Sequence, residues 1–233
     1  MMEYFVGTSG WVYSWNPYGS FDWYVKNSGL NSVELNMSFY RFPTTQVIQS
    51  WVSKGSSLKW VIKVNRAITH TYKFDGRAFK FWEAFKDLFT PLDRYISFYL
   101  FQIPPSITPN LIQRIERFIV NSDLGCRFAL EVRNIKWFDR AFIKWASDLG
   151  ITWVSVDSPN LPKDVYKTND IVYLRMHGRT TWYYHNYSDD ELEEVIGLIL
   201  KAEPKKVFVF FNNDHDMLEN ARKMLSKLNN LHR

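Results

Sequence analysis

The feature that most constrains the fold is a regular alternation of short strand-like runs with longer helix-like runs. Eight runs have the apolar patterns of strands and span residues 4–8, 32–35, 59–64, 95–101, 127–132, 151–156, 171–176 and 206–211. Seven runs have helical spacing and span residues 21–28, 44–53, 78–89, 109–121, 140–149, 189–202 and 215–228. Such alternation is typical of stacked βα units around a parallel sheet.

Eight βα steps in 233 residues predict an α/β protein whose fold is a single (β/α)8 TIM barrel, because that fold takes about 250 residues. We expect one domain over residues 1–233. The crossover after the sixth strand, residues 158–170, contains two prolines and no clear period, so we expect it to be irregular. Ser188 before an acidic run predicts a helix N-cap. The alternative is an open doubly wound sheet, which periodicity does not exclude.

Polar side chains recur with the same parity at the carboxyl ends of the predicted strands. In the fifth strand, Leu130 and Val132 face one way, while Glu131 and Arg133 face the other. The corresponding polar pairs are Glu34 with Asn36, Lys63 with Asn65, Ser155 with Asp157, Arg175 with His177, and Asn212 with Asp214. Barrels and open parallel sheets both build their sites at this end, so we predict a ligand site there. A purely structural ion-pair network is the alternative, but desolvation makes it a poor source of stability.

The residue types in this predicted site suggest roles. The candidates for proton transfer are Glu34, Glu131, Asp157 and His177. The candidates for substrate binding are Tyr40, Lys63, Arg66, His70, Gln102, Arg133, Trp137, Arg175, Arg179, Asn212, Asn213 and Asp214. If Glu131 lies beside Arg133, it stays ionised and suits the role of base or ligand holder better than that of acid. Gly178 and Arg179 could bind an anion after the seventh strand, whereas Asp214 could simply cap the last helix.

Lys63 has two interpretations. A buried lysine with a lowered pKa could form a Schiff base, whereas an ion pair with Glu34 or Glu131 would raise its pKa and keep it unreactive. We favour the ion pair. Glu34, Glu131, Asp157, His177 and Asp214 could in principle bind a divalent cation. We predict no metal, because no short ligand motif is present and three cations lie among these residues. The sequence indicates no particular cofactor.

Composition limits the partners. A formal charge of +5 and a pI near 9.1 favour a small or extended anionic ligand, but this charge is modest for the length. Glu3 and Gly7 argue against a signal peptide, and no apolar run is long enough to cross a bilayer, so we expect a cytoplasmic protein without a membrane partner. The single cysteine, Cys126, fits a reducing compartment, and we expect it to be buried filler. The sequence does not indicate an oligomeric state.

Several motifs match a known family in order along the chain. They are GTSGW (7–11), VELNMSFYRFP (33–43), KVNRAITH (63–70), FQIPPS (101–106), LEVRNIKWF (130–138), VDSP (156–159), YLRMHGR (173–179) and FFNND (210–214). These motifs cover nearly the whole chain and resemble the YecE-like family, domain of unknown function 72. Met37 and Ser38 replace Ser and Thr of the family's usual VEINSTFY form. The resemblance implies a TIM-barrel fold and supplies no established reaction.

Two hypotheses about function follow. The first is an enzyme, with hydrolase as its candidate class, that uses acid/base or hydrolytic chemistry on a polar, anionic substrate, phosphorylated or derived from nucleic acid. The alternative is a non-catalytic protein that binds nucleic acid or a sugar phosphate through an aromatic and basic rim. Aromatic residues make up 18% of the chain and many follow the predicted strands, which supports such a rim.

Overall fold

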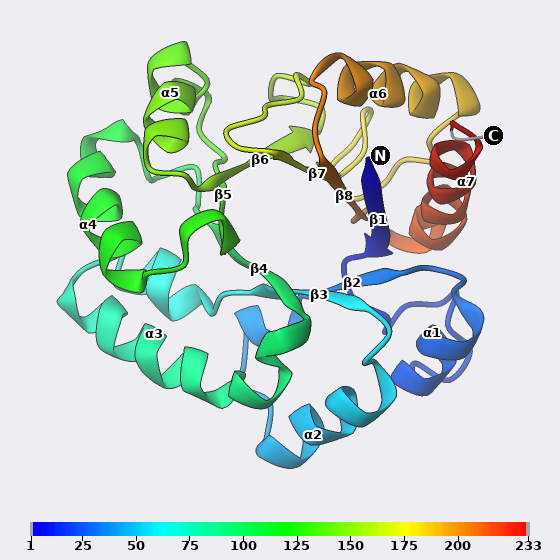
Figure 1. The fold of residues 1–233 in the computed structure, drawn as a ribbon, viewed down its shortest axis with the longest axis horizontal. Helices are drawn as coiled ribbons and strands as arrows, with labels where there is room; N and C mark the ends of the chain where they lie inside the picture. Colours follow the sequence, from blue (N-terminus) through cyan, green and yellow to red (C-terminus); the bar gives the residue numbers. More distant parts are fainter. Residues whose placement is uncertain (1, 232–233) are drawn as a thin grey trace.

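The computed structural model describes residues 2–231, and it confirms the predicted barrel of parallel strands with helices around it (Figure 1). The strands are β1 (Glu3–Thr8), β2 (Ser32–Leu35), β3 (Lys59–Lys63), β4 (Ile96–Gln102), β5 (Phe128–Glu131), β6 (Thr152–Asp157), β7 (Ile171–Met176) and β8 (Lys206–Phe211). The α-helices are α1 (Phe21–Asn27), α2 (Thr45–Lys54), α3 (Gly76–Leu88), α4 (Ile112–Ser122), α5 (Arg140–Asp148), α6 (Asp189–Lys201) and α7 (Met217–Asn230). Strands and helices therefore follow the predicted alternation.

Each strand pairs in parallel with its neighbours, in the order β1-β8-β7-β6-β5-β4-β3-β2, which rules out a doubly wound order. The seam between β1 and β2 is closed by one isolated parallel bridge, Ser9 to Glu34. The Asn31 side chain supplements that bridge, because it accepts from Val6 N at 2.8 Å and donates to Tyr4 O at 3.0 Å. Gly7 permits the close approach, since a Cβ there would lie 2.3 Å from Ser32 O. The barrel is therefore nearly closed.

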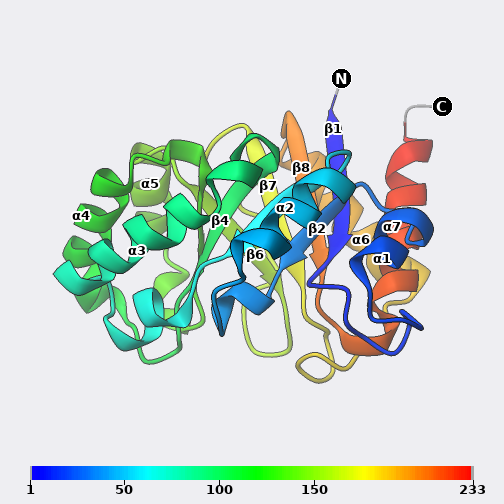
Figure 2. The same ribbon diagram turned by 90° about the horizontal axis from the view of Figure 1, so that it is seen from below.

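Apolar side chains fill two separate layers. The outer layer lies between strands and helices and includes the Trp60, Trp82 and Trp153 rings. The inner layer fills the lumen and comprises Val61, Phe98, Leu100, Ala129, Val154, Tyr173, Phe208 and Phe210, packed against Phe5 and Ile171. The lumen is a packed core, and polar side chains occupy only its carboxyl-terminal end. In the side view, the start of β1 and the end of α7 lie at the end of the barrel opposite the loops that follow the strands (Figure 2).

Local details follow the sequence closely, with one correction. Ser188 caps α6 in a reciprocal capping box with Glu191, as its position before the acidic run predicts. No helix lies between β6 and β7, so the irregular crossover is confirmed for residues 158–170. The expectation that Cys126 is buried was wrong: it is exposed, because it lies in the 3-10 turn Gly125–Arg127 that precedes β5. Within residues 2–231, no helix is long and apolar enough to cross a bilayer.

Candidate functional site

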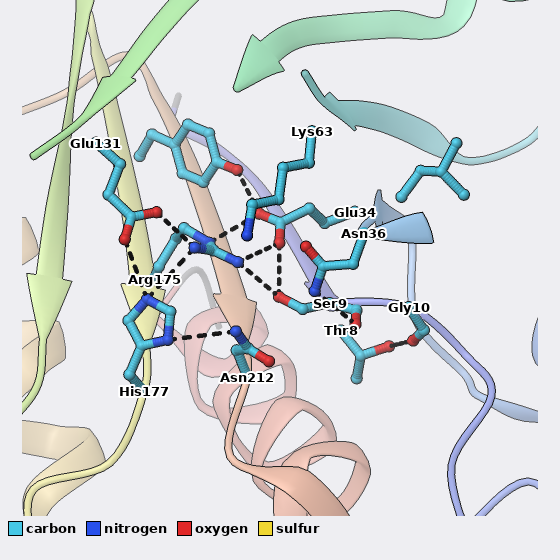
Figure 3. A network of polar contacts seen from close by, with 12 residues as sticks. Thr8, Ser9, Gly10, Glu34, Asn36, Lys63, Glu131, Arg175, His177 and Asn212 are labelled. Carbon is cyan, nitrogen blue, oxygen red and sulfur yellow. Dashed lines mark hydrogen bonds and ion pairs between the residues drawn. The ribbon is translucent and has the colours of Figure 1, made fainter. Parts of the chain in front are cut away.

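A buried ion-pair network lies at the carboxyl-terminal end of the lumen, centred on Arg175 of β7 (Figure 3). Arg175 Nε donates to Glu34 Oε2 at 3.0 Å, and Nη2 donates to Glu34 Oε1 at 2.5 Å. Arg175 Nη1 donates to Glu131 Oε2 at 2.5 Å. Glu34 also accepts from Ser9 Oγ at 2.7 Å and from the Tyr173 hydroxyl at 2.6 Å. One guanidinium therefore joins two carboxylates that come from different strands, β2 and β5, with β3 and β4 between them.

Glu131 connects this network to Arg133 and His177. Arg133 Nε donates to Glu131 Oε1, and Arg133 Nη2 lies 3.1 Å from His177 Nε2. His177 Nε2 is also 3.5 Å from Glu131 Oε1, while its Nδ1 lies 3.3 Å from the amide nitrogen of Asn212. Both ring nitrogens of His177 therefore have polar neighbours, from β5 on one side and from the end of β8 on the other (Figure 3).

The environment sets the charge of each buried group. Burial raises the pKa of Glu131, but Arg133, Arg175 and His177 outweigh burial and hold this pKa well below its usual range. Burial, Arg133 and Arg175 together lower the pKa of His177 well below its ordinary value. Burial lowers the pKa of Arg175, but Glu131 and Glu34 raise this pKa by a larger amount, so the guanidinium stays charged. At neutral pH the network therefore contains an ionised Glu131, a charged Arg175 and a neutral His177. The ionised state of Glu131 is the one that the sequence predicts for a carboxylate beside Arg133.

Lys63 differs from these groups because its amine has no carboxylate partner among residues 2–231. The predicted ion pair with Glu34 or Glu131 was wrong: the arginines bind both carboxylates, and Lys63 forms no ion pair within the described residues. The Lys63 amine lies 4.3 Å from the centre of the Phe39 ring, and its side chain points towards Arg175 and Glu34 (Figure 3). Burial, followed by the charge of Arg175, lowers the pKa of Lys63 to about 7, although Glu131 and Glu34 oppose the shift.

Solvent reaches only the upper part of this cluster. Glu34, Glu131, Arg175 and His177 are each 0% exposed, whereas Lys63, Arg133 and Asn212 are partly exposed. The loop after β7 covers His177 through Trp182 and Tyr183, whose ring centres both lie 5.4 Å from the imidazole. Arg133 stacks on Trp182 at 4.5 Å. A ligand that enters from solvent would therefore meet Lys63 and Arg133 before any carboxylate.

Two hollows flank the cluster. The larger has a volume of about 560 Å³ and is lined by Gln102, Arg133, Asn134, Asn160, Trp182 and Tyr183, among others. The smaller has a volume of about 270 Å³ and lies beyond β1 and β2, beside Ser9, Tyr13, Asn36 and Arg41. The larger hollow contains the cation Arg133 together with amide and aromatic side chains, which suits a polar ligand with a negative charge. Within residues 2–231, no three His, Cys, Asp or Glu side chains are arranged to hold a metal ion.

With this geometry in view, the chain can be compared with known proteins. The family model described as "Protein of unknown function DUF72" matches residues 5–233. The chain belongs to the DUF72 family. A DUF72 family protein from Enterococcus faecalis V583 has 25% sequence identity and a TM-score of 0.80, over 98% of this chain and 98% of that chain. A DUF72 family protein from Thermotoga maritima MSB8 has 22% identity and a TM-score of 0.82, over 97% of this chain and 99% of that chain.

A more distant match shares only the fold. It is a xylose isomerase-like TIM barrel/4-hydroxyphenylpyruvate dioxygenase fusion protein, with 12% identity and a TM-score of 0.57 over 97% of this chain and 42% of that chain. No curated protein matches the sequence. The comparisons therefore establish the DUF72 family and the TIM-barrel fold, and the chemistry of the site has to be argued from its residues.

The DUF72 barrel places Asp157 and Arg179 away from the lumen, which corrects the predicted parity of β6. Val154 and Val156 pair in register with Tyr173 and Arg175, so they face the lumen, while Asp157 pairs with Met176 on the outer face. There Asp157 accepts from Arg179 Nε at 2.9 Å and from the Tyr187 hydroxyl at 3.0 Å. Arg179 also donates to Glu194 at 2.6 Å, so carboxylates already bind the guanidinium that was predicted to clamp an anion.

Other predicted residues lie at varying distances from the cluster. Trp137 is 0% exposed and donates to Ile107 O at 2.9 Å, because the 3-10 turn Ile135–Trp137 that follows β5 directs its ring into the core. Asn213 is likewise buried and donates to His185 O and Asn220 Oδ1. Tyr40 and Arg66 are exposed at the rim. Asp214 does not cap α7, since the N-cap is Asp216 and that cap makes no side-chain hydrogen bond.

Gln102 and His70 lie closer to the cluster. Gln102 is partly exposed in the larger hollow, where its amide nitrogen donates to Ile103 O at 2.9 Å. His70 follows β3 in a π-helical turn, Ala67–Thr71, and its ring packs edge-on against Phe39 at 5.1 Å. Burial and the charges of Lys63 and Arg66 lower the pKa of His70 to about 4, so this imidazole is neutral at pH 7.

Sequence reasoning missed three residues of the site. Ser9 and Tyr173 donate hydrogen bonds to Glu34, and the Trp182 ring stacks against the Arg133 guanidinium. The parity of β7 already placed Tyr173 on the face of Arg175, and extending the parity of β1 past Gly7 would have added Ser9. Trp182 belongs to the aromatic rim predicted after the strands, but its stacking on Arg133 could not be predicted, because its position depends on the path of an irregular loop.

Proposed function

We propose that this DUF72 protein is an enzyme that binds a small, polar, anionic substrate at the carboxyl-terminal mouth of the barrel and transforms it by acid/base chemistry. One observation carries the proposal: an amine without a carboxylate partner, Lys63, lies at the solvent-facing edge of a buried network in which arginines bind every carboxylate. Stability does not explain such an arrangement, because a partly buried amine without a partner destabilises the folded state whenever it is protonated.

The anionic character of the substrate follows from the groups that solvent can reach. Arg133 uses two of its nitrogens for Glu131 and His177, and its remaining N–H groups are free to donate to a ligand in the larger hollow. Glu34 and Glu131 lie underneath and pair with Arg175 and Arg133, so guanidinium charges offset their repulsion of an anion at the surface of the cluster. Arg133 and Lys63 therefore form the anion-binding pair of the proposed site.

The acid/base character follows from Lys63. An amine with a pKa of about 7 is present in both protonation states at neutral pH, which suits proton transfer to and from a substrate. Glu34, Glu131 and His177 are buried beneath it, so in this proposal they act by positioning Arg175 and Arg133, which help to set the charge of Lys63. Asp157 lies outside the lumen and is left out of the reaction.

Binding without catalysis is the second candidate. Arg133 stacked on Trp182, with exposed Tyr183 and Ile135 at the same hollow, forms a surface on which a base or sugar ring could stack. In that case the protein would bind a nucleic acid or a sugar phosphate. Its affinity for single-stranded nucleic acid would depend strongly on salt concentration, and Lys63 would contribute only its positive charge to binding.

The test begins with inorganic phosphate as the probe for the anion site, measured by isothermal titration calorimetry. We expect Arg133→Gln to weaken phosphate binding about tenfold or more, because a charge-assisted bond is lost. Arg179→Gln is the matched control: it also removes a guanidinium bound to carboxylates, and it should change affinity less than about twofold. Equal effects of the two substitutions would remove Arg133 from the site.

Turnover is then sought in pools of phosphorylated and carboxylated metabolites, by mass spectrometry of compounds consumed. The protein and its Lys59→Met variant should consume the same compound, and Lys63→Met should not. Lys59 lies on the same strand but at its opposite end. Phosphate binding with no compound consumed would favour the second candidate, and turnover by Lys63→Met would exclude Lys63 as the acid/base group.

A further inference from the structure

The charges of the network balance without Lys63. Arg175 binds Glu34 and Glu131, and Arg133 binds Glu131, so two guanidiniums neutralise two carboxylates. A protonated Lys63 would add an extra positive charge to this enclosed group, close to Arg175. The network therefore opposes protonation of the amine, so a substantial share of it is neutral near pH 7, with a lone pair available for bonding to carbon.

The surroundings of the amine fit a nucleophile. Lys63 is the last residue of β3, its side chain is partly exposed, and Phe39 contributes an apolar face 4.3 Å from the amine. The same Phe39 ring contacts His70, which is carried by the π-helical turn Ala67–Thr71 and whose Nδ1 lies 2.8 Å from Thr69 Oγ1. Short π-helical segments are rare and are frequent at functional sites. The turn thus places a neutral imidazole against the same ring that the amine contacts.

From this arrangement we propose that Lys63 forms a Schiff base with a small aldehyde or ketone that carries a carboxylate or phosphate group. The proposal rests on the proposed function, because the anionic group would bind Arg133 while the carbonyl carbon meets Lys63. It names the class of substrate and the class of reaction, namely chemistry that proceeds through an imine. An anionic group on the substrate would also give a role to Arg133, the accessible arginine that lines the larger hollow.

The step is balanced without any further reactant. The lone pair of the Lys63 amine attacks the carbonyl carbon, a C–N bond forms, and the carbonyl oxygen takes up a proton to give a carbinolamine. The nitrogen then loses one proton, the hydroxyl group is protonated and leaves as water, and the protonated C=N bond that results loses the second proton from nitrogen to give the imine. In this proposal His70, a neutral imidazole packed on the Phe39 ring that the amine also contacts, carries these protons. Amine and carbonyl are consumed, imine and water are formed, and nothing is oxidised or reduced.

Reductive trapping tests the proposal on the full chain. The protein is incubated near neutral pH with pyruvate or with glyceraldehyde 3-phosphate, sodium cyanoborohydride is added, and peptides are mapped by mass spectrometry. We expect the secondary amine at Lys63 to exceed that at any exposed lysine by about tenfold or more, because an ordinary lysine with a pKa near 10.4 is almost fully protonated there. Pyruvate and glyceraldehyde 3-phosphate separate a carboxylate from a phosphate preference.

Three variants complete the experiment. Lys63→Met and Lys63→Arg should lose the dominant adduct, with circular dichroism used to verify that each is folded, while Lys59→Met should retain it. Labelling spread evenly over the exposed lysines would overturn the proposal. If Arg133-dependent phosphate binding persists while Lys63 remains unlabelled, the Schiff base is excluded and the proposed function stands. If phosphate binding is also absent, both fail.

Discussion

Arg175 on β7 and Glu34 on β2 form a two-armed ion pair across the barrel, with Nε–Oε2 and Nη2–Oε1 distances of 3.0 and 2.5 Å. Both side chains are 0% exposed. Glu34 is also the residue that makes the isolated bridge to Ser9, where β1 meets β2. The pair therefore connects β7 to the seam between β1 and β2. It also holds in place the guanidinium at the centre of the ion-pair network.

Glu34→Gln should destabilise the protein by about 3 kcal/mol, because it leaves a buried guanidinium with one carboxylate fewer. Equilibrium unfolding in urea measures the change. Asp22→Asn serves as the control, since Asp22 pairs with Lys54 at 2.8 Å on the exposed surface and should cost less than about 1 kcal/mol. A loss for Glu34→Gln no larger than that of the control would show that the network contributes little to folding.

Mild acid should destabilise the protein through its buried histidines. An unfolded histidine takes up a proton near pH 6.5, whereas the pKa of His70 is about 4 and that of His177 is well below its ordinary value. The unfolded state therefore binds more protons in this window, and stability is lost as the pH falls from about 6.5 towards 4. Ionised Glu131 adds a loss only below its ordinary pKa of 4.5.

The free energy of unfolding measured against pH tests this account. His177→Asn and His70→Asn should each flatten the curve between about pH 6.5 and pH 5, because each removes one proton-binding difference between the two states. His215→Asn is the control, since His215 is exposed. Unchanged slopes in both buried-histidine variants would contradict the assignment.

The fold and the position of the polar cluster were readable from the sequence, because both depend on periodicity. The parity of β5 and β7 correctly brought Glu131, Arg133, Arg175 and His177 into one cluster. The same argument failed for β6, since alternation separates two faces without saying which face is inside. Asp157 is stabilised on the outer face by partners that its neighbours in sequence do not reveal.

The state of Lys63 was not predictable for a related reason. An ion pair with Glu34 or Glu131 is the expected outcome when only residue types are known. Whether a carboxylate remains available depends on how many guanidiniums reach it first, which is a property of the three-dimensional arrangement. The loop that brings Trp182 over Arg133 depends on irregular backbone in the same way.

Lys63→Met should stabilise the folded state by about 1 kcal/mol or more near pH 7, because it removes a partly buried cation without a partner. The folded pKa of Lys63 is about 7 and the unfolded value is about 10.4, so between these values the unfolded state binds more protons. The stability contributed by the wild-type lysine therefore rises from about pH 7 to pH 10, and the advantage of Lys63→Met should shrink over that range. Thermal unfolding of both proteins across this range measures it. An advantage that stays constant with pH would show that the lysine titrates normally.

Gly178 should be essential to the loop that covers His177. Its φ of +107° lies outside the range that L side chains adopt easily, and an added Cβ would lie 2.7 Å from Thr181 O and 2.8 Å from the Cβ of His185. Gly178→Ala should therefore cost about 1–3 kcal/mol in urea unfolding. It should also weaken phosphate binding, because displacing the loop moves Trp182 away from Arg133.

Gly76→Ala is the matched control: Gly76 begins α3, a Cβ there meets nothing within 4 Å, and the change should leave stability equal or raise it by about 0.5 kcal/mol. If Gly178→Ala unfolds like Gly76→Ala and binds phosphate normally, the loop does not hold Arg133 in place.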